Sequence, residues 1–431
     1  MPRRSRGCAS CRRRRIGCDG ELPTCRQCRI TNRQCSGPLQ GALVIDQTDR
    51  IISKNRPKAE MIHQPSNQSM FAHAFINEFI SFITARNEQA RRQSWLTELQ
   101  SGFMAEQGPA LELSMQATAL AYCGTVSGNP AAVREACNIY GRALTKHSRS
   151  LTHDLSSPKA ASLGTCVMLS FFEAICSTNP VAYGTHLQAA KKMLALMPCV
   201  AGHKDELVIW QLGQHVQSQS LFVMLATPDQ YLQHAPVPAR WTKMAETEEH
   251  PPTSQQGVDR LMYDLFYLTD VLVRRSYTTD TNFHLNEDII PEIDQLWLDF
   301  KDQATQLGEL IQWPVPPGAQ YHDPFIAMVV AYFGASWVLL SVLEPYMCNN
   351  QFEDSCHAIL ESSRFLGGRN LGCAHLRMFF PLTIVAMYGP CSEHREAADK
   401  LLGQRIQKTA FKGMGSVAIG RVQSSRALYH E

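Results

Sequence analysis

Six cysteines within the first thirty-five residues constrain this chain more than any other feature. They form two sets with the same spacing, C-x2-C-x6-C, so the second half repeats the first: Cys8, Cys11, Cys18, Cys25, Cys28 and Cys35. Thiolates at C-x2-C spacing commonly bind zinc, because a tight turn brings two sulfurs onto one tetrahedral ion. The stretch is too polar for these cysteines to be scattered core residues. We therefore expect a metal centre.

Three metal centres can be considered for six cysteines. One zinc held by Cys8, Cys11, Cys25 and Cys28 would leave two cysteines unused, and so would an iron–sulfur cluster. Two zinc ions need eight ligand positions, so two of the six thiolates must bridge the metals. Only the two-zinc centre uses every cysteine and the repeat, and it is the one we expect. A segment this short has no hydrophobic core, so metal binding supplies its folding energy.

The cysteine-rich segment, residues 1–37, is the head of the chain and is strongly basic. Residues 1–35 hold ten arginines against two acids, a net of +8, so residues 36–431 carry −6 of the chain's overall +2. This asymmetry favours a polyanionic partner for the head. Four consecutive arginines lie between Cys11 and Cys18, where both ends of the run are anchored.

We interpret the run Arg12, Arg13, Arg14 and Arg15 as a DNA-docking helix rather than as a localisation signal. Some of these guanidinium groups would neutralise phosphates, which adds affinity without sequence information. Others can reach O6 and N7 of guanine in the major groove. RNA-binding modules usually carry stacking aromatic residues, and residues 1–35 contain no Phe, Tyr or Trp. Duplex DNA is therefore favoured over RNA.

The segment GCASCRRRRIGCDGELPTCRQCRITNRQC resembles the zinc binuclear cluster of fungal transcription regulators. The shared features are the six cysteines, the basic run after Cys11, Asp19 directly after Cys18, and Pro23 two residues before Cys25. The resemblance implies a fold held by two zinc ions and a DNA-binding function.

The resemblance also implies roles for single residues. Cys8 and Cys25 would bridge the two metals, Arg15 beside Arg14 would contact bases, and CGG-like triplets would be recognised. One position departs from the family, since the residue before the third cysteine is usually Lys or Arg and here is Gly17. This removes one phosphate contact, for which Arg12 or Arg13 would have to compensate.

The rest of the chain shows helical periodicity and weak strand signals. We expect helices from residue 71, at 109–127, from Pro130, after Ser157-Pro158, after Asn179-Pro180, and at 204–226, 257–275, 284–311, 324–344, 351–366, 374–388 and 392–411. Residues 326–343 carry no charge, and we interpret them as a buried core helix rather than a membrane span. The expected domains are a zinc cluster at 1–37, a flexible linker at 38–70, an all-α regulatory domain at 71–411 and a flexible, Gly- and Ser-rich tail at 412–431.

Three segments of the helical part resemble the fungal-specific transcription factor domain of regulators of sterol and secondary metabolism. They are IYGRALTKHSRSL at 139–151, LSFFEAICSTNPVAYGTHLQAAKKML at 169–194 and RMFFPLTIVAMY at 377–388. This resemblance implies a helical regulatory domain. It leaves undecided whether that domain has a ligand pocket.

Signs of an enzyme are missing from the sequence. It contains no G-x-S-x-G, G-x-x-x-x-G-K-[ST] or H-E-x-x-H motif. We interpret GMGSVAIG near the C-terminus as a tail turn and His186, on an apolar helix face, as a core or capping residue. The histidines His73, His147, His153 and His394 show no paired ligands at useful spacing. We therefore expect no enzymatic activity.

The sequence thus predicts a small zinc binuclear cluster followed by a large all-α regulatory domain, in a nuclear transcription regulator. We expect two zinc ions, double-stranded DNA with CGG-like half-sites, contact with the transcription machinery or co-regulators, and no membrane. An activator of RNA polymerase II genes, in a secondary-metabolite or sterol pathway, is favoured on the resemblance alone. The alternative is a zinc-headed adaptor or repressor whose helical part binds a small molecule or partner protein. No coiled-coil pattern follows Cys35, so the sequence does not distinguish a monomer from a homodimer formed through the helical part.

Overall fold

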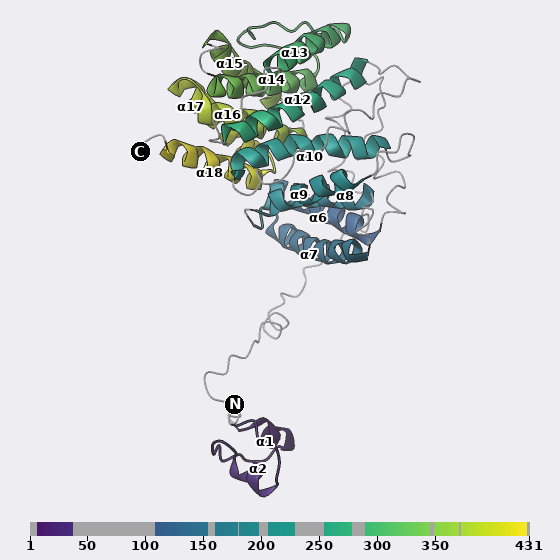
Figure 1. Cartoon of the computed structure of the whole chain (residues 1–431), viewed down its shortest axis with the longest axis vertical. Helices are drawn as coiled ribbons and strands as arrows, with labels where there is room; N and C mark the ends of the chain where they lie inside the picture. Colours follow the sequence, from purple (N-terminus) through teal and green to yellow (C-terminus); the bar gives the residue numbers. More distant parts are fainter. Residues whose placement is uncertain are drawn as a thin grey trace. The chain divides into compact units, whose positions relative to one another are not determined.

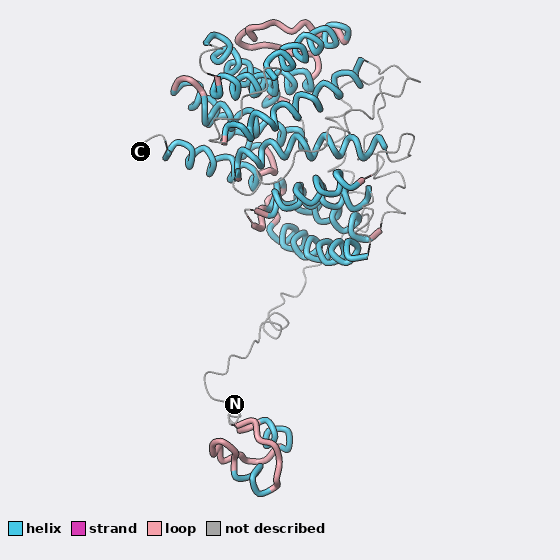
Figure 2. The backbone as a smooth tube through the Cα atoms, in the orientation of Figure 1, coloured by secondary structure: helices cyan, strands magenta, loops and turns pink. Residues whose placement is uncertain are grey.

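The computed structural model describes residues 7–37, 108–153, 160–179, 181–197, 206–228, 254–277, 289–344, 349–369 and 372–428. The chain divides into two compact units, residues 1–66 and residues 67–431. The first contains the head, and we call the described residues 108–428 of the second the body. All the described elements are helical, which confirms the expected fold class (Figure 2). The predicted linker at 38–70 and the helix expected from residue 71 lie outside the described residues.

Two short helices form the head. Helix α1 spans Ala9–Arg14 and helix α2 spans Arg26–Ile30, and each begins directly after the first cysteine of its half. The twofold repeat of the sequence is therefore also a repeat of structure, because each C-x2-C pair occupies the first turn of a helix.

The body is a stack of helices in which neighbours along the chain pack against each other (Figure 1). They are α6 (Pro109–Val126), α7 (Pro130–His153), α8 (Ala160–Cys176), α9 (Ala182–Leu196), α10 (Glu206–Ala226), α12 (Ser254–Ser276), α13 (Ile289–Gln306), α14 (Pro324–Leu343), α15 (Asn349–Gly367), the 3-10 helix η3 (Gly372–Met378), α16 (Phe379–Tyr388), α17 (Ser392–Lys408) and α18 (Lys412–Leu428). Most lie within a few residues of the predicted ranges.

Proline and side-chain caps explain where several helices begin. Pro130 is the first residue of α7, and the Asn129 side chain accepts hydrogen bonds from the amides of Ala131 and Ala132, at 3.0 and 3.2 Å. Asp323 caps α14 in the same way and precedes Pro324. The missing N–H of proline costs nothing at the first helical position, where no intrahelical acceptor exists, so Asx-Pro is an effective start signal.

Helix α14 is the apolar centre of the body. It is long and apolar enough to cross a membrane, and 89% of its most apolar window is buried inside the structure. It packs against α12, α13, α15 and α16, so no face is left for charged residues. Gly334 permits the close approach of α15, because a Cβ atom there would lie 2.9 Å from the Ile359 side chain and 3.0 Å from the Ser355 carbonyl oxygen. The prediction of a buried core helix agrees with this environment.

The segment predicted as a flexible tail is instead helical. Residues 412–428 form α18, which packs on α8, α16 and α17, with Met414, Ala418 and Val422 buried at intervals of four residues. The GMGSVAIG segment is therefore not a turn. Only residues 429–431 of the predicted tail lie outside the described residues.

Two of the three glycines of α18, Gly413 and Gly415, permit close packing of the helix. A Cβ atom on Gly413 would lie 2.6 Å from the Glu173 carbonyl oxygen of α8 and 2.7 Å from the Ser177 Cβ. On Gly415 it would lie 2.1 Å from the Ile406 side chain of α17. Glycine weakens an isolated helix, which is why local propensity points to a frayed tail. Here the lost propensity is offset by contacts that larger residues would prevent.

Candidate metal centre and nucleic-acid interface

The first cysteine of each half caps the helix that follows it. The Cys8 sulfur accepts a hydrogen bond from the Cys11 amide, and the Cys25 sulfur accepts one from the Cys28 amide, both at 3.4 Å. Both capping residues have extended backbones. One helical turn therefore aims both sulfurs of each C-x2-C pair in the same direction, as a metal ion requires.

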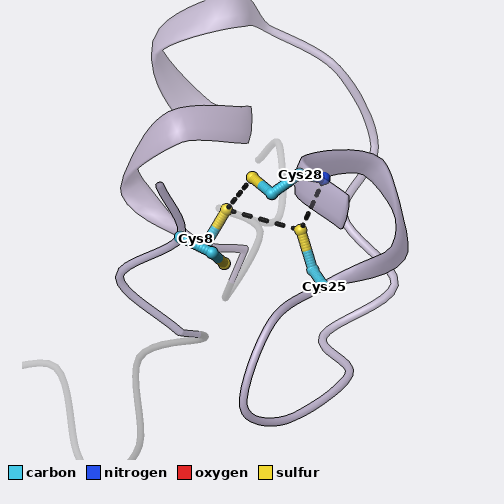
Figure 3. Close-up of side chains that lie close together, drawn as sticks. Cys8, Cys25 and Cys28 are labelled. Atoms are coloured by element: carbon cyan, nitrogen blue, oxygen red, sulfur yellow. Dashed lines mark hydrogen bonds between the residues drawn. The ribbon is translucent and has the colours of Figure 1, made fainter. Parts of the chain in front are cut away.

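The sulfurs of the two halves meet at the centre of the head (Figure 3). Cys8 Sγ lies 3.7 Å from Cys25 Sγ and 3.6 Å from Cys28 Sγ, and Cys11 Sγ lies 3.8 Å from Cys25 Sγ. Two thiolates on one tetrahedral zinc, with Zn–S bonds of about 2.3 Å, stand roughly 3.8 Å apart. The spacing therefore fits zinc ligation without rearrangement.

The six cysteines form two sets of four whose sulfurs all lie within 4.8 Å of one another. One set is Cys8, Cys11, Cys18 and Cys25, and the other is Cys8, Cys25, Cys28 and Cys35. The two sets share Cys8 and Cys25. A single site formed by Cys8, Cys11, Cys25 and Cys28 would not use Cys18 or Cys35. In the structure, Cys18 belongs to the first set and Cys35 to the second.

Burial and backbone amides divide the thiols into two kinds. The sulfurs at the centre are buried, and burial raises the pKa of Cys11 to about 12. The half-buried Cys18 accepts a hydrogen bond from the Cys8 amide, which lowers its pKa. A hydrogen bond from the Cys25 amide acts on Cys35 in the same way and lowers the pKa of this thiol to about 7. The half-buried thiols thus favour the thiolate form that metal binding needs.

The two halves also cap each other. The Asp19 carboxylate accepts the amide of Arg26, the first residue of α2, at 3.0 and 3.1 Å. Ser36 Oγ accepts the amide of Ala9, the first residue of α1, at 3.0 Å. Asp19 and Ser36 each directly follow the third cysteine of their own half. Each half therefore completes the first turn of the other half's helix.

The Arg12–Arg15 run is arranged differently from a single helix. Arg12, Arg13 and Arg14 form the last turn of α1, whereas Arg15 caps its C-terminal end with φ of 58°. At the equivalent position of the second half, Asn32 has φ of 46°. All four arginine side chains are exposed, and no ion pair to them occurs among residues 7–37. The run is thus helical as far as Arg14, whereas Arg15 lies in a left-handed turn, and its docking on DNA stays a prediction.

The sequence does not predict the two caps. The resemblance includes Asp19, but the only signal for Ser36 is its place one residue after Cys35, which mirrors that of Asp19 after Cys18. Elsewhere, His186 contacts the core as expected, since its Nε2 lies 2.8 Å from the Tyr140 hydroxyl.

Comparison with known proteins gives two family matches. Residues 6–40 match the fungal Zn(2)-Cys(6) binuclear cluster domain, and residues 69–288 match the fungal specific transcription factor domain. No curated protein and no solved structure matches the chain. The first match coincides with the six clustered cysteines and the second begins before the body and covers α6 to α12.

Proposed function

The chain belongs to the family of the fungal specific transcription factor domain and carries a Zn(2)-Cys(6) binuclear cluster, which binds two zinc ions; from this premise we propose how it recognises DNA. Proteins of these families are transcription regulators, and their zinc clusters bind DNA. The finer questions are which residues hold the metal, which contact DNA and what sequence they select.

We propose that all six head cysteines bind zinc and that Cys8 and Cys25 bridge the two ions. The observation that supports this is the pair of four-sulfur sets with Cys8 and Cys25 in common. Six thiolates and two divalent ions leave a core charge of about −2, which the surrounding arginines more than offset. Elemental analysis of the purified chain should give two zinc ions, and a value of one would contradict the bridged arrangement.

The exposed Arg12–Arg15 run is the proposed DNA-contacting surface. Arg15 is the proposed base-contacting residue, selecting a CGG-like triplet with its planar guanidinium, because its left-handed turn separates it from the helical arginines. Arg12, Arg13 and Arg14 supply phosphate contacts, since one helical turn spreads them around α1. The Glu21–Arg29 ion pair, at 3.1 Å, leaves the second half with less free positive charge than the first.

A binding titration with the full-length, zinc-loaded chain tests this assignment. Affinity for a duplex with a CGG triplet is compared with a scrambled duplex at two or more salt concentrations. Arg15→Ala should cost about 1–3 kcal/mol on the CGG duplex and relax the preference. Arg13→Ala should weaken binding to both duplexes alike and reduce the salt slope by about one. Equal affinity of the unaltered chain for both duplexes would contradict base recognition.

Duplexes that carry one triplet or two triplets at varied spacing separate a monomer from a homodimer. A homodimer would bind the paired sites cooperatively at one preferred spacing, whereas a monomer would bind them independently.

We further propose that the chain acts in the nucleus as an activator of RNA polymerase II genes. The support is the family of both domains. Fusion of residues 67–431 to an unrelated DNA-binding domain should raise transcription of a reporter, and a fall in transcription would indicate a repressor.

A further inference from the structure

A thiol and an imidazole form a close pair at the start of α17, remote in sequence from the head. Cys391 Sγ lies 2.9 Å from His394 Nδ1. Cys391 is the N-cap residue of this 17-residue helix and has an extended backbone, yet its side chain makes no capping hydrogen bond to the helix amides. The sulfur is therefore directed to the imidazole ring instead of the first turn.

The turn before α17 holds this pair in place. Gly389 lies so close to the helix that a Cβ atom on it would stand 3.2 Å from the His394 Cβ and 2.7 Å from the Val385 carbonyl oxygen. Arg395 Nη1 donates to the Gly389 carbonyl oxygen at 2.6 Å. Pro390 separates Gly389 from Cys391 and restricts the backbone between them. The thiol and the ring thus belong to one fixed turn.

The environment of His394 leaves the ring able to accept a proton. Burial lowers its pKa below the usual value, Glu353 of α15 and Glu393 oppose this shift, and His357 of α15 adds to it. The ring is therefore neutral near pH 7, and its Nδ1 can receive the proton of the neighbouring thiol.

The cysteines of this region differ in accessibility. Cys391 is half-buried, whereas Cys356 of α15 is fully buried and burial raises its pKa to about 12. Cys356 is therefore a poor partner for a disulfide. Cys137, on α7, is more exposed than Cys391, and no histidine contact to its sulfur occurs within the described ranges. Burial and the Glu173 carboxylate raise the pKa of Cys137, so it provides a reference for an exposed thiol whose surroundings disfavour the thiolate and supply no adjacent base.

We propose that Cys391 is a nucleophilic thiol that forms covalent adducts with α,β-unsaturated carbonyl compounds, with His394 as its base. A thiol–imidazole pair within hydrogen-bonding distance is the arrangement that activates cysteine nucleophiles. The sulfur forms a bond to the β-carbon while the π electrons of the C=C bond move to the α-carbon. The thiol proton, accepted by His394 Nδ1, is returned to that α-carbon. The addition needs no oxidant and no leaving group.

The experiment uses the full-length, zinc-loaded chain and N-ethylmaleimide, a compound of this class. The chain is treated with less than one equivalent of reagent at pH 7, quenched at intervals and digested. Mass spectrometry of the peptides then gives the rate of modification at each cysteine. Cys391 should react at least about 10-fold faster than the more exposed Cys137. Comparable rates at the two cysteines would overturn the proposal, and this comparison requires no variant.

Two histidine variants test whether the base acts by direct contact. His394→Gln should slow modification of Cys391 to about the rate of Cys137 and leave Cys137 unchanged. His357→Gln removes a nearby imidazole that makes no contact with the sulfur, and should change the Cys391 rate by less than about twofold. An undiminished rate in His394→Gln, or an equal loss in His357→Gln, would show that His394 does not activate the thiol. Circular dichroism of each variant establishes that it is folded.

Discussion

The Nη1 atom of Arg405 lies 2.6 Å from Nδ1 of His375, so a buried guanidinium donates a hydrogen bond to a neutral imidazole. Nη2 of the same side chain donates to the carbonyl oxygen and hydroxyl of Ser363, at 3.0 and 2.9 Å. Ser363 lies near the C-terminal end of α15, where the helix dipole favours a cation. Arg405 thereby joins α17, η3 and α15 without an acidic partner among the residues that the structure describes.

Replacement of Arg405 should destabilise the body more than its single charge suggests. Arg405→Ala removes the donor to the buried His375 Nδ1 and Ser363 Oγ, and we expect a loss of about 2–3 kcal/mol in the free energy of unfolding. Urea unfolding monitored by circular dichroism measures it. Lys408→Ala, at an exposed position of the same helix, is the control and should change the free energy by less than about 0.5 kcal/mol. Equal stability of the two variants would contradict the role of Arg405.

Buried histidines should make the body sensitive to mild acid. Burial lowers the pKa of His186 to about 4 and those of His215 and His375 to about 3. The unfolded chain binds these protons below about pH 6.5 while the folded chain does not, so stability is complete above that pH and falls as the pH drops toward the folded pKa values. His186→Gln should reduce the loss between pH 6 and pH 5 by roughly 1.2 kcal/mol. Urea midpoints at each pH give the slope, and parallel curves for both proteins would exclude a contribution from His186.

Two glycines of α18 form a matched pair. Gly413→Ala places a Cβ atom 2.6 Å from the Glu173 carbonyl oxygen. Because this oxygen belongs to the backbone of α8 and cannot easily move away, the substitution should lower the free energy of unfolding by about 1–3 kcal/mol. Gly420→Ala meets nothing within 4 Å, so its better helix propensity should stabilise the body by about 0.5–1 kcal/mol. Thermal unfolding of both variants should shift the midpoint in opposite directions. A shift of the same sign in both would mean that α18 does not dock on α8.

The position before the third cysteine can be tested by restoring the family residue. A Cβ atom on Gly17 meets nothing within 4 Å and its φ is ordinary, so Gly17→Lys is sterically acceptable. The new ammonium group should raise affinity for CGG and scrambled duplexes alike and steepen the salt dependence by about one. An anisotropy titration at several salt concentrations measures both effects. A gain restricted to the CGG duplex would instead place residue 17 among the base contacts.

The reciprocal caps of the head predict unequal roles for two neighbouring acids. Asp19→Ala removes the acceptor for the Arg26 amide and should speed the release of zinc to a coloured chelator. Glu21→Ala breaks only an exposed ion pair with Arg29 and should leave the release rate unchanged. If both variants released zinc at the rate of the unaltered head, the cap would not hold the cluster together.

Local sequence signals accounted for the head and for most helix boundaries. The cysteine spacing implied two metals with shared ligands because eight ligand positions exceed six thiols, and the two sulfur sets agree with that count. Helices were predicted to begin at Pro130 and at residue 324, and α7 and α14 begin there, because a helix start depends on adjacent residues. The all-α fold followed from periodicity, which needs no knowledge of the partner helices.

What the sequence did not reveal depends on contacts between distant residues. Glycine in α18 looks like a helix breaker until Glu173 is known to lie against it. The Ser36 cap becomes visible only when the two halves of the head are folded together. The Cys391–His394 pair was predictable, since its members stand three positions apart in the sequence, but spacing alone does not distinguish a packed histidine from a base.

The docking of α18 on α8 also sets the order in which the body can be completed during synthesis. Gly413 follows Glu173 by 240 residues, which a ribosome needs roughly 12–48 s to add at 5–20 residues per second. The surface of α8 that receives Gly413 therefore stays uncovered until α18 has left the exit tunnel. The sulfur sets and the reciprocal caps described for the head all lie within residues 7–37. A nascent chain would consequently be able to take up zinc long before its regulatory half is closed.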